Sequence, residues 1–273
     1  MTDTRLERVL ARDRVVVSIA LALITTLAWI YILRLARDMD MPGMNMTGWR
    51  MASSGLRMVM APAQAPWTAV QFVLMAEMWA VMMVGMMTPS AAPLILLYAR
   101  VGRQAAAEGK PFGATGWFAG GYLFAWTIFA VAATMGQWVL ERAALLTPMM
   151  ASASATFGAA VLIAAGAYQW SRIKDVCLVQ CQSPLAFLQR HGGFRGGARG
   201  AFGLGARHGA YCVGCCWVLM LLLFVGGVMN IAWVAMLAIL VLLEKVTPVG
   251  RAVARVSGAG LVAAGAWILL ASR

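Results

Sequence analysis

Repeated apolar runs of about twenty residues constrain the fold of this chain more than any other feature. Of its 273 residues, 62% are hydrophobic and only 12% are charged. A helix needs about 20 apolar residues to cross a bilayer, and a soluble domain does not contain such runs repeatedly. We therefore expect an all-α, polytopic transmembrane helical bundle formed by one integral membrane domain over residues 1–273. The seven predicted spans cover residues 15–33, 67–99, 113–139, 151–170, 208–226, 229–245 and 256–271.

The distribution of lysine and arginine predicts the orientation of these spans. With the N-terminus inside, 16 of the 22 basic residues fall on the inner side and 6 on the outer side, as the positive-inside rule requires. Topology then explains the net charge of +12, and nucleic acid is not expected as a partner. We expect a multi-pass protein of the bacterial inner membrane, with an outer loop at 34–66 and an inner loop at 171–207. Oligomer formation stays open.

The second predicted span carries an unusual amount of sulfur on one side. At about 100° per residue, four methionines fall within about 80° of one another, and two more flank them. Methionine is a flexible apolar filler as well as a soft metal ligand, so helix packing and metal binding both fit this stripe. The methionine stripe consists of Met75, Met78, Met82 and Met86, with Met83 and Met87 beside them.

Glu77 projects from nearly the opposite side of the same helix. It lies ten residues after Trp67, which corresponds to a depth of roughly 15 Å in the bilayer. An acid at that depth costs roughly 2.5 to 3.5 kcal/mol, so a function is favoured. We expect Glu77 to supply local negative charge or to carry a coupled proton. A protonated carboxyl group bonded to a neighbouring helix is the alternative.

The predicted outer loop is also rich in methionine. Thirteen of the twenty methionines lie between Met39 and Met87, and the first seven fall in this loop. Thioethers need no deprotonation, so they can hold Cu(I) where thiols would be oxidised. The interleaved Asp, Asn, Gly and Pro residues disfavour a packed core and leave a disordered linker as the alternative. The candidate ligands are Met39, Met41, Met44 and Met46.

All five cysteines and both histidines fall on the predicted inner side. In the fifth span a histidine, two cysteines and a methionine recur every fourth residue, which places them on one helical face. Thiolates bind soft metals more strongly than thioethers, so a gradient from an outer methionine loop to an inner thiol cluster is expected. Buried cysteine as a small hydrophobe is the alternative. The candidate ligands are Cys177, Cys181, His208, Cys212, Cys215, Cys216 and Met220.

Glycine patterns give two further expectations. In the third span, Gly116, Gly120 and Gly121 predict close helix packing. The glycine-rich run over residues 192–200 lacks a Gly-Lys-Ser/Thr ending, so it predicts a flexible loop rather than a phosphate-binding loop.

Three segments together resemble a bacterial family of predicted metal-binding integral membrane proteins. These segments are the run from His208 through Cys212, Cys215 and Cys216 to residues 224–230 with Glu244 and Lys245 after it, the second-span run over 79–89, and residues 177–184. The resemblance extends from about residue 67 to 250. It implies copper handling of a chaperone-like kind.

We expect a copper-handling protein rather than an enzyme. Cu(I) would be captured at the outer methionine loop, move along the methionine stripe and reach the inner cysteines, for transport or for delivery to a cuproenzyme or a periplasmic copper carrier. A membrane thiol-disulfide oxidoreductase that uses Cys177/Cys181 and Cys212/Cys215 as exchanging pairs is one alternative. A scaffold subunit of a membrane complex is the other.

Overall fold

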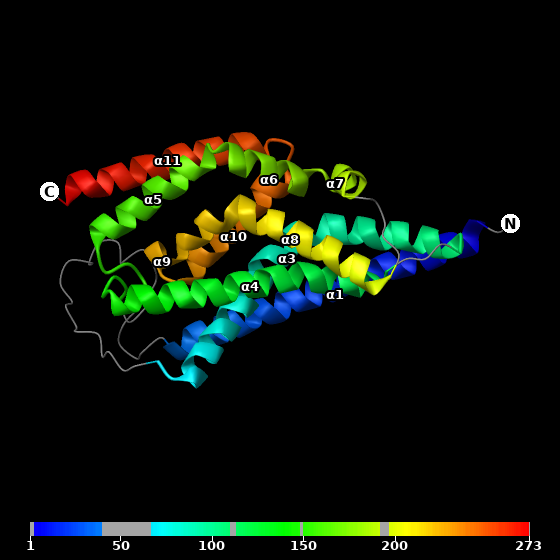
Figure 1. The fold of residues 1–273 in the computed structure, drawn as a ribbon, viewed down its shortest axis with the longest axis horizontal. Coiled ribbons are helices and arrows are strands. Elements are labelled where there is room, and N and C mark those ends of the chain that lie inside the picture. The colour runs from blue at the N-terminus through cyan, green and yellow to red at the C-terminus, as the bar shows by residue number, and fades with distance from the viewer. Residues whose placement is uncertain (1–2, 40–66, 110–112, 148–149, 192–196, 273) are drawn as a thin grey trace.

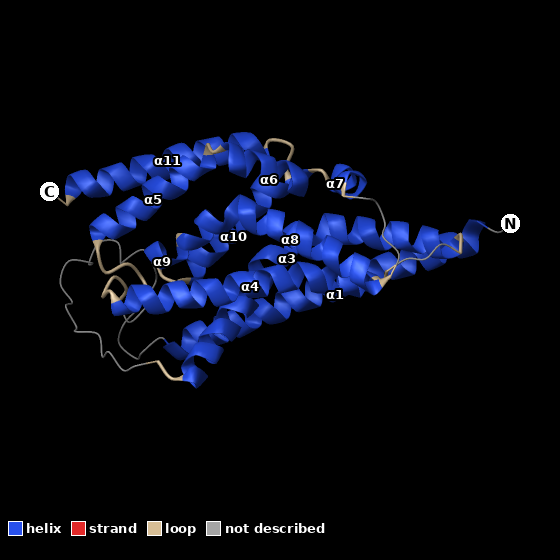
Figure 2. Ribbon diagram, viewed as in Figure 1, coloured by secondary structure: helices blue, strands red, loops and turns tan. Residues whose placement is uncertain are grey.

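The described part of the chain is built from α-helices, which confirms the predicted all-α bundle (Figures 1 and 2). The computed structural model describes residues 3–39, 67–109, 113–147, 150–191 and 197–272. No strand occurs among these residues, although Leu146 and Ser152 form an isolated bridge. The helices are α1 (Asp3–Met39), α3 (Ala69–Ala107), α4 (Thr115–Arg142), α5 (Ala155–Gln169), α6 (Arg172–Gln182), α7 (Pro184–Arg190), α8 (Ala198–Leu221), α9 (Leu223–Gly226), α10 (Ile231–Val246) and α11 (Gly250–Ala271).

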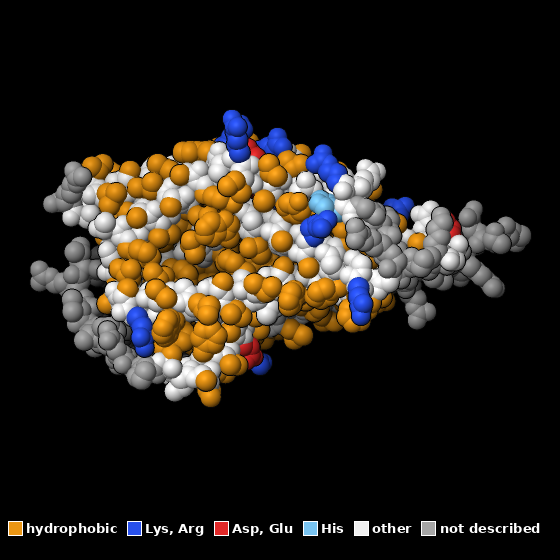
Figure 3. Space-filling view, viewed as in Figure 1, with side chains coloured by type: hydrophobic (Ala, Val, Ile, Leu, Met, Phe, Trp, Pro, Cys, Tyr) orange, Lys and Arg blue, Asp and Glu red, His pale blue; other side chains and the backbone are white. Residues whose placement is uncertain are grey.

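Five helices within the described residues are long and apolar enough to cross a membrane. Large apolar side chains such as Leu27, Val73 and Trp267 are exposed on them, and Figure 3 shows an apolar surface over most of one face. Such a surface suits lipid rather than water. Every predicted span contains a helix, but α5 and α10 are shorter, so the number seven stays a prediction. The five stretches are Val15–Arg37, Ala69–Ala105, Thr115–Arg142, Ala198–Gly226 and Gly250–Ala271.

Helix α3 lies at the centre of the bundle and continues through Pro89 and Pro93. Proline has no N–H, so the carbonyl four residues before Pro89, that of Gly85, loses its helical donor. The indole Nε1 of Trp29 in α1 donates to that carbonyl at 3.2 Å. A Cβ at Gly85 would lie 3.2 Å from Cβ of Ala28, so α1 packs closely at this point. The bend-prone part of α3 is thereby held by its neighbour.

Two helix pairs pack closely because glycines face the partner. A Cβ at Gly121 of α4 would lie 2.0 Å from the carbonyl oxygen of Phe202 in α8. A Cβ at Gly166 of α5 would lie 2.6 Å from the carbonyl oxygen of Gly258 in α11, and these two helices run together along one edge of the molecule (Figure 1). Only residues without a side chain allow such an approach.

The predicted packing role is confirmed for Gly121 but is wrong for Gly116 and Gly120. A Cβ at either of these two positions would meet nothing within 4 Å. Gly116 and Gly120 are four residues apart and share one side of α4, whereas Gly121 lies about 100° around the helix from Gly120, on the side that faces α8.

The predicted inner loop over 171–207 contains helices α6 and α7 and the start of α8, and its position on the inner side of the membrane stays a prediction. The hydroxyl of Ser171 accepts from Lys174 N at 3.1 Å and caps α6, and Pro184 starts α7. Helix α8 begins ten residues before the predicted span. Ala201 and Leu204 are buried there, and packing of this stretch on α4 outweighs the low helix propensity of its glycines. The flexible loop predicted for 192–200 is therefore wrong from Ala198 onward, and residues 192–196 lie outside the described part.

Candidate metal centre

Three cysteines of α8 lie one helical turn apart on the side that faces the protein interior. Cys212, Cys215 and Cys216 are all buried, and all five cysteines of the chain are free thiols. The Sγ atoms of Cys215 and Cys216 donate to the carbonyl oxygen of Cys212 at 3.1 and 2.9 Å. The i, i+3, i+4 spacing therefore brings three sulfur atoms to one face of one helix, as the sequence predicts.

Helix α6 adds a fourth sulfur to this group. The thiol of Cys181 lies near the thiols of Cys212 and Cys215 and interacts with both. These contacts, together with burial, raise the pKa of Cys181 well above the usual thiol range, because they favour the protonated form. Copper or any other metal must therefore displace a proton to bind this sulfur.

Cys177 lies one turn earlier on α6 and packs against α8. Its Sγ would be 2.9 Å from a Cβ at Gly214, so the glycine makes room for it. Burial, and then the neighbouring charge of Cys215, raise the pKa of Cys177. Cys177 thus adjoins the cluster, although Cys181 makes the thiol contacts.

A buried lysine from α10 points into the sulfur group. The Nζ atom of Lys245 lies 2.9 Å from Sγ of Cys212, 3.5 Å from Sγ of Cys216 and 3.8 Å from Sδ of Met87. Lys245 is only 4% exposed, and a buried ammonium group requires a partner that carries or accepts charge. Among the described residues, its polar side-chain partners are sulfur atoms. We call Cys181, Cys212, Cys215, Cys216, Met87 and Lys245 the sulfur–lysine cluster.

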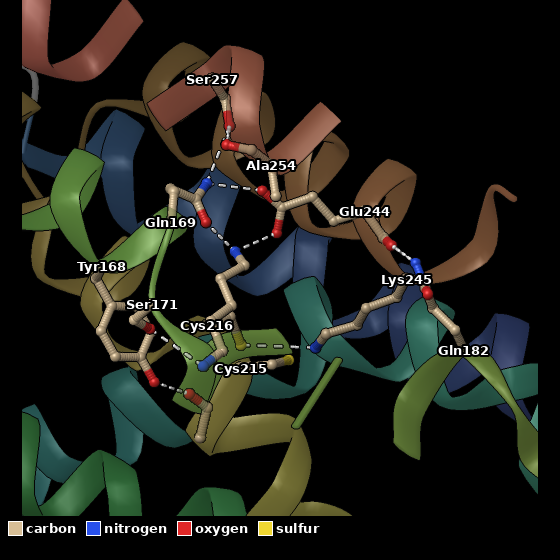
Figure 4. Close-up of polar contacts among 12 residues, drawn as sticks. Tyr168, Gln169, Ser171, Gln182, Cys215, Cys216, Glu244, Lys245, Ala254 and Ser257 are labelled. Atoms are coloured by element: carbon tan, nitrogen blue, oxygen red, sulfur yellow. Dashed lines mark hydrogen bonds and ion pairs between the residues drawn. The ribbon is translucent and has the colours of Figure 1, made fainter. Parts of the chain in front are cut away.

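The neighbouring Glu244 is engaged elsewhere and does not neutralise Lys245. Its carboxylate forms an ion pair with Lys174 of α6 at 2.6 Å and accepts from Nε2 of Gln169 at 2.7 Å. Gln169 also accepts from Lys174 and donates to the hydroxyl of Ser257. Figure 4 shows the consequence: the Glu244 side chain points toward Gln169, and the Lys245 side chain points toward Cys216.

Two aromatic groups close the cluster on the side of α4. The hydroxyl of Tyr122 lies 3.2 Å from Sγ of Cys212 and donates to the carbonyl oxygen of Met87 at 3.0 Å. The ring of His208 stacks near Tyr122 at 5.7 Å and packs edge-on against Phe187 at 5.1 Å. Nδ1 of His208 is buried and has no hydrogen-bond partner among the described residues. An orphaned imidazole nitrogen beside thiols fits a donor set for a soft metal.

The methionine stripe runs from Met75, near the N-terminal end of α3, to Met87 in the sulfur–lysine cluster. Its members from Met78 to Met87 are buried, whereas Met75 is half-buried. Sδ of Met75 lies 3.9 Å from Nε2 of Gln137, which also donates to Glu141 at 2.8 Å. The indole of Trp67 donates to the same carboxylate at 2.8 Å. Twelve residues of α3, about 18 Å of helix, separate this polar end from Met87.

Other predicted site residues lie apart from the cluster. Glu77 is exposed and lies near Tyr31 of α1. The charged side chain beside the thiols is that of Lys245, so the charge there is positive rather than negative. The role of Glu77 in charge or proton coupling stays a prediction. Met220 is buried one turn beyond Cys216. Met41, Met44 and Met46 lie outside the described residues, and Met39 is the last residue of α1.

Within the described residues, no three His, Cys, Asp or Glu side chains form a ready-made metal site. The thiols of Cys215 and Cys216 are occupied with the Cys212 carbonyl. Metal binding therefore requires the thiols of Cys215 and Cys216 to lose their protons and to exchange these hydrogen bonds for metal bonds.

Sequence reasoning missed the polar partners of the cysteines. From the sequence, Lys245 is only the last residue of the predicted span over 229–245 and part of the family resemblance. Tyr122 and Lys174 carried no signal at all. A lysine directly after Glu244 inside an otherwise apolar stretch was the one available hint.

A family model with the description "PpoB2: Copper chaperone" matches residues 76–268. The matched region contains every residue of the sulfur–lysine cluster. No curated protein and no solved structure matched the chain. Because the match covers more than half of its length, the chain belongs to the PpoB2 copper chaperone family.

Proposed function

We propose that this protein binds Cu(I) at the sulfur–lysine cluster within the bacterial inner membrane and passes it on. The recipient would be the other side of the membrane, a cuproenzyme under assembly or a periplasmic copper carrier. One observation carries the proposal: the buried ammonium group of Lys245 contacts the sulfur atoms of Cys212, Cys216 and Met87. Thiolate and thioether sulfur are the ligands that Cu(I) prefers, and the family match supports copper handling.

Charge balance is compatible with Cu(I) at this site. A Cu(I) ion held by two thiolates carries a net charge of −1, which Lys245 cancels. Zn(II) held by four thiolates would leave a net charge of −1 after the same cancellation, although Zn(II) held by three thiolates and the neutral His208 ring would be balanced. The thioether of Met87 beside the thiols therefore favours Cu(I), because a zinc site does not need methionine sulfur.

The increase in Cu(I) affinity from thioether to thiolate ligands suggests a route for the metal. Thioethers bind Cu(I) more weakly than thiolates, and the methionine stripe ends at Met87 in the cluster. In this proposal, Cu(I) arrives from the outer methionine residues, passes along α3 and is held by Cys212 and its neighbours. The protein acts as a carrier, not as an enzyme.

The test is the copper content of protein purified under anaerobic conditions from copper-supplemented cells. The parent should retain copper, and the Cys212/Cys215/Cys216→Ser triple variant should lose it. Cys177→Ser is the matched control, because Cys177 lies beside the cluster without contacting Lys245. A folded parent without copper, or a triple variant that keeps it, would contradict the proposal.

A thiol-disulfide oxidoreductase is the second candidate, and one contact favours it. The thiol of Cys181 in α6 reaches Cys212 and Cys215 in α8, so two helices present sulfur atoms that can exchange a disulfide. Thiol labelling in reduced and oxidised cells separates the candidates. Redox cycling of these cysteines supports the oxidoreductase, whereas protection that depends on copper alone supports the carrier. If Cys→Ser variants leave every copper phenotype unchanged, the protein acts as a scaffold subunit.

A further inference from the structure

A second polar site lies at the start of α8, away from the sulfur–lysine cluster. It is a cavity of about 130 Å³. One buried water needs roughly 10–15 Å³ of such space, so the cavity has room for a much larger polar group. Its lining residues are His191, Arg199, Gly200, Gly203, Leu204 and Arg207.

The two arginines and a glycine form one face of α8. Arg199, Gly203 and Arg207 are spaced four residues apart, so they point in the same direction, with the arginine Cα atoms about 12 Å apart along the axis. A Cβ at Gly203 would meet nothing within 4 Å. The missing side chain therefore leaves the hollow between the two guanidinium groups.

Positive charge in this hollow has no internal counterion. Both arginines are exposed, and no carboxylate lies within ion-pair distance of either among the described residues. The N-terminal end of α8 adds the positive end of a helix dipole beside Arg199. An anion is thus the complementary ligand.

His191 forms a fixed wall of the cavity. Its Nδ1 lies 2.9 Å from the carbonyl oxygen of Phe187, and because a carbonyl only accepts, Nδ1 carries the proton. Its ring packs against Phe187 at 4.6 Å and Tyr211 at 5.6 Å. The wall does not depend on the ligand for its position.

The location restricts where the anion comes from. The apolar stretch Ala198–Gly226 begins at the cavity, so Arg199 and Arg207 lie at the end of a membrane-length helix. Figure 3 shows histidine and basic side chains gathered at this end of the apolar face. Arginines at such a boundary meet lipid headgroups.

We propose that this cavity binds a phosphate group, supplied by an anionic phospholipid whose headgroup enters between Arg199 and Arg207. Planar guanidinium groups donate paired hydrogen bonds that match phosphate oxygens. The bound lipid would tie the start of α8 to the membrane boundary. This site is independent of copper binding.

The test measures lipid binding to the purified full-length protein in detergent by native mass spectrometry. Phosphatidylglycerol, phosphatidylcholine and inorganic phosphate are added in separate titrations. Phosphatidylglycerol should bind more tightly than phosphatidylcholine. Replacing one arginine, Arg199→Gln or Arg207→Gln, should weaken its binding about fivefold, and both together about thirtyfold.

Two further variants guard against a general charge effect. Gly203→Leu fills the hollow without changing charge, enters open space and should abolish selective binding. Arg251→Gln removes an exposed charge from α11 and should change binding by less than about twofold. Inorganic phosphate bound in place of lipid, and lost in Gly203→Leu, would support the phosphate site with a soluble source. Equal binding of the two lipids without phosphate binding, or parental binding by Gly203→Leu, would overturn the proposal.

Discussion

Replacing Lys245 with methionine removes the positive charge beside the thiols and should weaken Cu(I) binding strongly. Nζ lies 2.9 and 3.5 Å from the sulfur atoms of Cys212 and Cys216. At an effective dielectric constant of about 20, unit charges at these distances attract by about 5 to 6 kcal/mol. Removing one partner of a buried pair costs about 3–5 kcal/mol. We therefore expect the Cu(I) dissociation constant to rise by about two to four orders of magnitude.

The thermal stability of the copper-free protein should not fall when Lys245 is replaced with methionine. Methionine occupies the apolar space of the lysine stem, and a buried ammonium group disappears with the substitution. A thiolate that loses its cation can take up a proton, so the copper-free variant buries no unpaired charge. Lys245→Met should therefore keep or gain thermal stability without copper while it loses copper affinity. A role in packing alone would not separate these two properties.

The assay is a competition titration against a chromogenic Cu(I) chelator under anaerobic conditions, with thermal unfolding of the copper-free protein in parallel. Lys245→Arg preserves the charge and should retain most of the affinity. The reasoning is refuted if folded Lys245→Met binds Cu(I) within about threefold of the parent. It is refuted equally if Lys245→Arg loses as much affinity as Lys245→Met.

Three further predictions follow from neighbouring contacts. Glu244→Gln leaves Lys174 as an uncompensated buried cation and should lower the free energy of unfolding, measured by chemical denaturation, by about 3–5 kcal/mol. Adding Lys174→Met should recover part of this loss. Met82→Leu combined with Met86→Leu keeps the core volume, so stability should change by less than about 1.5 kcal/mol while Cu(I) uptake into vesicles slows; unchanged uptake would exclude the stripe as the route. Because its thiol contacts raise the pKa of Cys181, the copper-free protein should be most stable below the ordinary thiol pKa and lose stability as pH rises through the raised value. Melting curves across pH should show a smaller loss in Cys181→Ser than in the parent, since the raised pKa of Cys177 remains.

Much of the fold could be predicted from the sequence, because a lipid-facing helix must be apolar over its whole length. Each apolar run contains a helix in the structure. Helices α6 and α7 could not be recognised in the same way, since they are too short to form an apolar run of membrane length and lie between longer helices. Their start signals, Ser171 and Pro184, were present, but glycine and arginine nearby favoured a loop. The direction in which Gly121 faces depends on where α8 lies, which is a tertiary property.

The candidate site likewise has one part that could be predicted from local helical spacing and one part that depends on tertiary packing. Helical spacing alone brings Cys212, Cys215 and Cys216 together, because residues three and four apart share a face. Lys245 comes from another helix, 33 residues after Cys212, and only the packing of α10 brings it to the sulfur atoms. A lysine at the end of an apolar run usually marks the membrane boundary, and its burial cannot be read from its position in the sequence.

The ion pair on the far side of α10 explains why Lys245 remains available to the thiols. Glu244 is its nearest carboxylate along the chain and would neutralise it if free to turn. Lys174 and Gln169 both hold that carboxylate, and Gln182 donates to the Glu244 carbonyl at 2.7 Å. With Glu244 fixed in this way, the charge of Lys245 is directed toward sulfur. The buried pair thus acts on the proposed copper site indirectly, by withholding the anion that would otherwise compete with the thiolates for Lys245.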